Sequence, residues 1–287
     1  MTIFVAYLAT DGGRDAVALG VQVARSMRTD LAVGMIVPPD AAAPITPGDF
    51  VDQVLTAQAD EWLRAAVAAV PADVAVSTHV RVSDSPAEGI IAEAERLGAD
   101  AVVIGGTGGG LLGSHSLGSV ANDLIHSSSV GLLVAPRGYA DLALPTIRRI
   151  TCAVGTRAGA DELLDVAIAS AARAEVPLRL ISLVAFDLMP GHRRADPVAQ
   201  DQARDHAERV LDEARARLSG SVPVSVSVAV GPTVEDAVEQ VGWESGDIIM
   251  VGSSRLAAPR RLFLGSTAAK MLRRLDVPMV VVPKEGI

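Results

Sequence analysis

The sequence predicts an α/β protein built from two tandem, doubly wound domains. Gly105 recurs as Gly252 and Gly118 as Gly265, and both offsets (252 − 105 and 265 − 118) equal 147 residues. Short apolar runs alternate with longer helix-like stretches, which is the pattern of a doubly wound sheet. The runs are almost continuously apolar, as expected of parallel strands covered on both faces. A repeat of about half the chain indicates two domains, because solenoid periods are only about 20–50 residues.

The first half contains five predicted strands that alternate with four predicted helices. Each strand is a short run dominated by Val, Ile, Leu and Ala, and each helix is a longer stretch in which apolar and polar residues alternate with helical spacing. The strands are predicted at 3–9, 31–37, 74–82, 101–105 and 131–135, and the helices at 14–27, 49–69, 86–97 and 119–127.

The second half repeats this order. Its strands are predicted at 149–154, 178–184, 222–230, 247–251 and 278–282, and its helices at 159–174, 197–218, 233–242 and 266–274. We therefore expect one domain over residues 1–140 and another over 146–287, joined by a linker from about Arg137 to Arg148. A connection this short favours two domains that pack against each other over two that are flexibly tethered.

A glycine-rich segment follows the fourth strand of the first half. Six of the nine residues from Gly105 to Gly113 are glycine, and Gly118 then leads into a predicted helix. Glycine lets a backbone approach an anion closely, and a helix N-terminus offers free N–H groups, so the segment suits a nucleotide phosphate. An ordinary flexible βα loop is the alternative. No Gly-Lys-Ser/Thr follows, which excludes a P-loop, and the segment lies after the wrong strand for a dinucleotide fingerprint.

Asp11 follows the first strand and precedes a predicted helix. Aspartate at such a position is commonly an N-cap. A carboxylate at the carboxyl end of a parallel strand also lies where ligands of doubly wound sheets bind, and it can accept hydrogen bonds from a ribose or a base. Both roles are compatible with the sequence.

These features together resemble the universal stress protein family over nearly the whole chain, in two copies. The resemblance rests on the Asp11-Gly12 pair, on the motif Gly-x-x-Gly-x9-Gly-Ser that begins at Gly105, and on the apolar run from Leu132 to Pro136. It implies a five-stranded parallel sheet between helices and a site for ATP, with or without Mg²⁺.

The resemblance also implies roles for single residues. The glycines and the serine of the motif would hold the phosphates, and the next residue would offer a backbone N–H. Asp11 would hold the ribose side, and Ile36, late in the second strand, would meet adenine unless it is plain core. The implied nucleotide-binding residues are Asp11, Ile36, Gly105, Gly108, Gly118, Ser119 and Val120.

The second half departs from this motif at two positions. Arg255 replaces the second glycine, and Arg157 stands where the first half has Asp11, allowing a one-residue slip. An arginine can pair with phosphate, but here it replaces a residue whose advantage is the lack of a side chain. We therefore expect an intact site in the first half and a weakened or lost one in the second.

Composition excludes several classes of function. The net charge of −9 and the 3% share of aromatic residues argue against a nucleic-acid partner. The five histidines show no metal-ligand spacing, and no apolar run reaches the roughly 18 residues that a membrane span needs. The single cysteine, Cys152, is expected to be a buried apolar residue. Together with the absence of a signal peptide, these features predict a cytoplasmic protein.

The expected function is that of an ATP-binding sensor or adaptor in a stress response. The sequence offers no nucleophile, base or Lys–Mg²⁺ arrangement for phosphoryl transfer, so an enzyme is not expected beyond slow ATP hydrolysis. Slow ATPase activity, binding of AMP or cyclic AMP, and a nucleotide-independent role through protein contacts stay open. Each half ends in a strand expected at a sheet edge, which predicts an internal pseudo-dimer and favours a homodimer of the whole chain.

Overall fold

The computed structural model describes residues 2–39, 49–106, 118–155, 160–186, 197–216, 222–253 and 262–283. For 49–55, 197 and 199 it describes the backbone alone. In the first half the strands are β1 Thr2–Ala6, β2 Asp30–Val37, β3 Val76–Val82, β4 Ala101–Gly105 and β5 Gly131–Ala135. The helices are α1 Asp11–Met27, α2 Asp49–Val67, α3 Pro86–Leu97 and α4 Ser119–Ser127, followed by a short 3₁₀ helix, η1 Tyr139–Leu142.

The second half has the same order of elements. Its strands are β6 Arg149–Ala153, β7 Leu178–Ala185, β8 Val224–Gly231, β9 Asp247–Gly252 and β10 Met279–Val282. Its helices are α5 Ala160–Ala174, α6 Pro197–Ala216, α7 Val234–Glu239 and α8 Ser266–Leu272. The predicted α/β class and the two tandem domains, each with five parallel strands, are confirmed.

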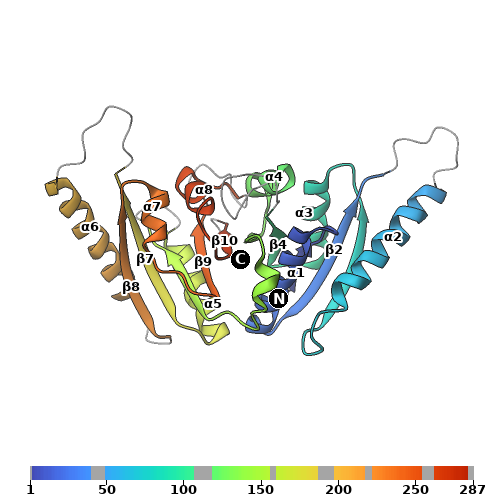
Figure 1. Ribbon diagram of the computed structural model, residues 1–287, viewed down its shortest axis with the longest axis horizontal. Coiled ribbons are helices and arrows are strands. Elements are labelled where there is room, and N and C mark those ends of the chain that lie inside the picture. The colour runs from blue at the N-terminus through green and yellow to red at the C-terminus, as the bar shows by residue number, and fades with distance from the viewer. Residues whose placement is uncertain are drawn as a thin grey trace.

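The ten strands form one sheet in the order β3-β2-β1-β4-β5-β10-β9-β6-β7-β8. Within each half all pairings are parallel, and β5 and β10 join the halves through an antiparallel pair that places Leu133 opposite Val280. The two halves therefore lie side by side with β10 near the middle of the molecule and α2 and α6 at its two ends (Figure 1). Because β5 and β10 each have a strand on both sides, neither offers a free edge to a second copy of the chain.

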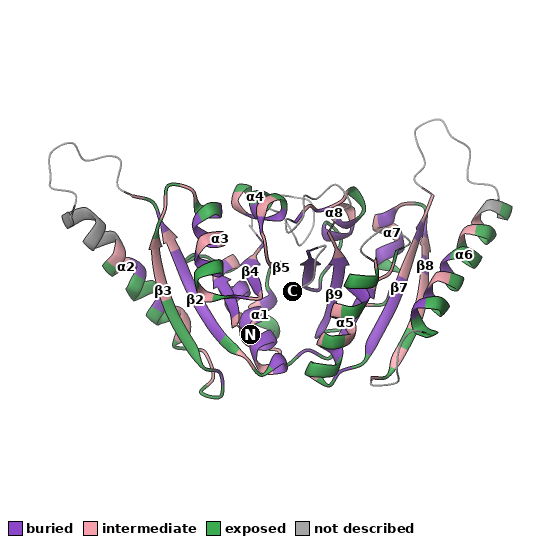
Figure 2. Ribbon diagram, turned by 180° about the vertical axis from the view of Figure 1, so that it is seen from behind, coloured by how far each residue is buried: buried purple, intermediate pink, exposed green. Residues whose placement is uncertain are grey.

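The core consists of two apolar layers, one on each face of the sheet, and each layer runs through both halves. Alternate strand residues supply them: Ile3 and Val5 belong to one layer and Phe4 to the other. The central strands β1, β4, β5, β9 and β10 are almost entirely buried, whereas β3 at one end is largely exposed (Figure 2). Cys152 is fully buried, as predicted, and burial raises the pKa of its thiol to about 12.

The linker is packed tightly against α1, which the sequence did not reveal. Tyr139 of η1 is 3% exposed, and its hydroxyl donates a hydrogen bond to Gln22 of α1. The Asp15 carboxylate accepts hydrogen bonds from the backbone N–H groups of Gly138 at 2.9 Å and Ala140 at 2.8 Å. Buried polar groups of α1 are thus satisfied by the linker, which fixes the path of the chain between the halves.

Candidate functional site

The candidate residues of the first half lie at the carboxyl ends of the parallel strands. β1 has β2 on one side and β4 on the other. The chain leaves β1 toward β2 and crosses back to β4, so the gap between β1 and β4 is the topological switch point of this half. Ligands of doubly wound sheets bind at such a point.

Two glycine segments meet there backbone to backbone. A Cβ atom on Gly105 would lie 1.8 Å from the carbonyl oxygen of Gly12, and one on Gly12 would lie 2.6 Å from the carbonyl oxygen of Gly106. Any side chain at Gly105 therefore forces the β1–α1 connection away from the end of β4. The glycine at this position is explained by this close approach, whatever else it contacts.

The amino terminus of α4 is a second feature of the site. Gly118 is the N-cap, with φ −70° and ψ 173°, and no side chain caps the helix there. Ser119 is exposed and Val120 half-buried in the first turn. The first N–H groups of a helix lack intrahelical acceptors and carry a partial positive charge, which is suited to an anion.

Asp11 is the first residue of α1 and not its cap. Thr10 is the N-cap, because its hydroxyl accepts a hydrogen bond from the Gly13 N–H at 3.2 Å. This corrects the interpretation of Asp11 as a capping residue. Its side chain points outward instead, with 93% of its surface exposed. A threonine directly before Asp-Gly-Gly is the sequence signal that would have identified the cap.

Arg14 is a charged neighbour of Asp11 that sequence reasoning missed. Its guanidinium lies 3.6 Å from the Asp11 carboxylate and 3.5 Å from that of Asp141 in η1. The i,i+3 spacing of Asp11 and Arg14 on one helix was the available signal. The pair connects the candidate site with the linker.

Ile36 is half-buried near the end of β2. Its Cγ2 atom lies 2.7 Å from the place of a Cβ on Gly89, so the side chain packs against α3. Gly108 lies outside the described residues, as do Arg157 and Arg255 of the second half. Among the residues that the structure describes, no group of three or more His, Cys, Asp or Glu side chains is placed to hold a metal ion.

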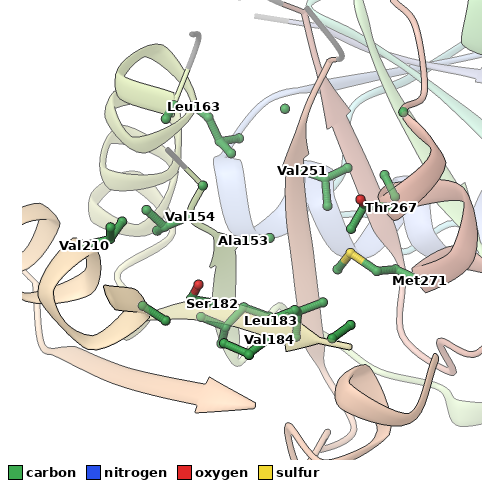
Figure 3. A pocket seen from close by; sticks show the side chains of 18 of the residues that line it. Ala153, Val154, Leu163, Ser182, Leu183, Val184, Val210, Val251, Thr267 and Met271 are labelled. Atoms are coloured by element: carbon green, nitrogen blue, oxygen red, sulfur yellow. The ribbon is translucent and has the colours of Figure 1, made fainter. Parts of the chain in front are cut away.

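The second half contains a cavity of about 500 Å³ at the equivalent place. It lies at the carboxyl ends of β6, β7 and β9 and reaches α8 on one side and α6 on the other (Figure 3). Four residues of the cavity lining are the counterparts, 147 positions later in the sequence, of candidate residues of the first half. Leu183 corresponds to Ile36, Gly252 to Gly105, Gly265 to Gly118 and Thr267 to Val120. Positions that are far apart in the sequence thus surround one hollow.

Comparison with known proteins gives a consistent result. A sequence model described as the universal stress protein family matches residues 1–136 and again residues 146–283. "Universal stress protein Rv2319c" of Mycobacterium tuberculosis is 28% identical over 300 residues, which cover 99% of this chain and 100% of that protein. "Universal stress protein Slr1230" of Synechocystis is 26% identical over 164 residues, covering 57% of this chain and 50% of that protein.

Solved structures agree at the level of the fold. A universal stress protein from Archaeoglobus fulgidus superimposes with a TM-score of 0.67 at 17% identity, covering 98% of both chains. A putative universal stress protein from Pseudomonas aeruginosa gives a TM-score of 0.58 at 15% identity, covering 98% of this chain and 92% of that one. None of the described helices is long and apolar enough to cross a membrane. The two family matches span nearly the whole chain, and the chain therefore belongs to the universal stress protein family.

Proposed function

We propose that the first half binds ATP, with or without Mg²⁺, and that the chain acts in the cytoplasm as a nucleotide-dependent sensor or adaptor in a stress response. The observation that carries the proposal is the cavity of the second half. Four of its lining residues occupy the positions equivalent to Ile36, Gly105, Gly118 and Val120. Because the two halves share one fold, the same four positions of the first half are expected to surround a ligand.

The residues of the first half offer the chemistry that a nucleotide requires. α4 is a helix of nine residues without a side-chain cap, and its N-terminus provides N–H groups and positive potential for a phosphate. The exposed carboxylate of Asp11 is available to accept hydrogen bonds from ribose hydroxyls. Ile36 offers a half-buried apolar surface for a base. A cradle of this kind recognises phosphate more than its number, so AMP and cyclic AMP are competing ligands.

The structure identifies which glycine is suitable for a test. Substitution of Gly105 would push its Cβ into Gly12 and disturb the fold, whereas Gly118 has extended backbone angles that any residue adopts. Gly118→Val should therefore fold and abolish ATP binding, because the branched side chain would cover the start of α4. Gly265→Val is the matched control, since Gly265 is the uncapped N-cap of α8 with φ −65° and ψ 159°.

Titration calorimetry of both variants and the native chain provides the measurement. We expect about one nucleotide per chain in the native protein and in Gly265→Val, and no binding in Gly118→Val. Unchanged affinity in Gly118→Val would refute the assigned site, and absence of binding by the native chain would support a role through protein contacts alone. Release of ADP over hours would identify a slow ATPase.

A homodimer of the whole chain stays a prediction, which light scattering tests. Because both edges of β5 and β10 are paired within the chain, such a dimer would have to use another surface.

A further inference from the structure

The cavity of the second half extends beyond the positions equivalent to the nucleotide site. One part lies between β7, β9 and α8, where Leu183, Val251 and Met271 line it. Another part reaches the opposite helical layer, where it is lined by Leu163 of α5 and Val210 of α6 (Figure 3). The cavity therefore passes over the carboxyl edge of the sheet and has apolar walls on both sides. Its volume of about 500 Å³ is typical of small-molecule sites, which measure roughly 300–1,000 Å³.

The described residues of the lining include no acidic or basic side chain that is charged throughout the neutral pH range. Among the described residues around the cavity there is no Asp, Glu, Lys or Arg, and His206 is the one titratable side chain. The other polar side chains among these described residues are the hydroxyls of Ser182, Ser253 and Thr267. Ser253 is already engaged, since its hydroxyl accepts a hydrogen bond from the Phe263 N–H at 2.9 Å.

Backbone donors at the strand ends are also occupied. The acceptors are backbone carbonyl oxygens. The Val154 N–H donates to Ile181 at 2.8 Å, the Ser253 N–H donates to Val282 at 2.8 Å, and the Phe186 N–H donates to Gly231 at 3.4 Å. An anion placed at these strand ends would lose its hydration without gaining these donors, which leaves the uncapped N-terminus of α8, a helix of only seven residues, as the described source of free N–H groups. Burying a charge without a partner is strongly unfavourable, whereas removing apolar surface from water is favourable.

We propose that this cavity is a second ligand site, which takes an uncharged, largely apolar small molecule with one or two hydrogen-bonding groups. Ser182 on β7 and Thr267 on α8 are positioned in the lining to bond those groups. The site does not depend on nucleotide binding in the first half. The sequence agrees with a difference between the halves, since neither Ala158, 147 positions after Asp11, nor Arg157, its counterpart with the one-residue slip, has a carboxylate.

Two lining positions of the second half supply variants that fill the cavity. Among the described residues, the atom nearest to a Cβ on Gly252 is Leu163 Cδ2 at 3.6 Å, an ordinary contact. Gly252→Val is therefore expected to fold and to fill part of the cavity. Ala203→Leu fills it from α6 with a good helix former. Ser225→Val adds similar bulk at an exposed position of β8 and is the matched control.

Two fluorescent probes with the same ring system test the class of ligand in the full chain. N-phenylnaphthylamine is neutral, and anilinonaphthalene sulfonate carries one negative charge. We expect the neutral probe to bind at about one per chain and more tightly than the sulfonate. Filling the cavity should weaken this binding by about tenfold or more in Gly252→Val and Ala203→Leu, but not in Ser225→Val. Circular dichroism and thermal unfolding verify that each variant is folded.

Other outcomes overturn the proposal. Absence of binding by the neutral probe, or binding that neither filling variant weakens, would show that the cavity is not a site. Equal or tighter binding of the sulfonate would show that the N-terminus of α8 makes it an anion site. Displacement of the neutral probe by ATP in Gly118→Val, where the first-half site is blocked, would show that the second half is a nucleotide site as well.

Discussion

Asp247 is the buried charge on which the second half depends. Its side chain is 1% exposed at the start of β9. The carboxylate accepts hydrogen bonds from Arg149 Nε at 2.9 Å and Nη2 at 2.6 Å, and from Arg179 Nη2 at 3.1 Å. Asp247, the first residue of β9, thereby links Arg149, the first residue of β6, to Arg179 of β7. Asp247→Asn keeps the volume and removes the charge.

The expected loss of stability follows from what the two arginines retain. Breaking a buried ion pair from one side costs about 3–5 kcal/mol. The Arg149 side chain is 22% exposed and keeps a contact with Glu244 at 3.2 Å, so water and Glu244 compensate part of its loss. The Arg179 side chain is 9% exposed. It keeps its hydrogen bonds to Thr151 and to two backbone carbonyls but loses its buried counter-ion. We therefore expect the lower end, about 3 kcal/mol.

The two tryptophans make the measurement specific for one half. Trp243 lies 4.9 Å from the Arg179 guanidinium, and Trp62 belongs to the first half, so Trp62→Phe leaves Trp243 as the only tryptophan. Urea unfolding followed by Trp243 emission should show the midpoint of Asp247→Asn lowered by roughly 1–2 M. Asp100→Asn is the matched control, because Asp100 is the equivalent residue of the first half and bonds the backbone N–H of Thr2 at 2.7 Å. A loss below about 1 kcal/mol, with unchanged emission of Trp243, would refute the reasoning.

Two further predictions concern the first half. Hydrogen bonds from Arg96 hold the pKa of Glu93 below its ordinary value. Burial of the carboxylate acts in the opposite direction, and a hydrogen bond from Arg81 lowers the pKa further. This stabilisation is complete above pH of about 4.3 and disappears as the pH falls through the lowered pKa. Glu93→Gln should therefore lower the free energy of unfolding by about 2 kcal/mol at pH 7 and should reduce the loss of stability on acidification. Urea unfolding at a series of pH values provides the measurement. A variant that loses stability on acidification as steeply as the native chain would contradict this reasoning. Gly105→Ala should cost about 3 kcal/mol because its Cβ meets Gly12, and an unchanged thermal midpoint of this variant would disprove the close approach.

The sequence by itself determined the class and order of this fold. The 147-residue repeat and the alternation of apolar runs with helical stretches were sufficient to predict ten strands and eight helices close to their observed positions. The predicted strands 101–105 and 131–135, for example, coincide with β4 and β5. Helix ends were less accurate: the last helix-like stretch before β9 was expected to reach residue 242, but α7 ends at Glu239, shortly before Gly242 takes a left-handed conformation. Local periodicity encodes these features because each depends on residues that are near in sequence.

Only the tertiary structure decided how the candidate residues meet. The close approach of Gly12 to Gly105, the packing of η1 against α1, and the bonding of Arg179 to Asp247 join residues that are 93, 117 and 68 positions apart. The cavity of the second half combines small and apolar residues of several elements, none of which is distinctive in the sequence. Contacts of this kind depend on sheet order and on the fit of distant surfaces, which no local pattern of residues records.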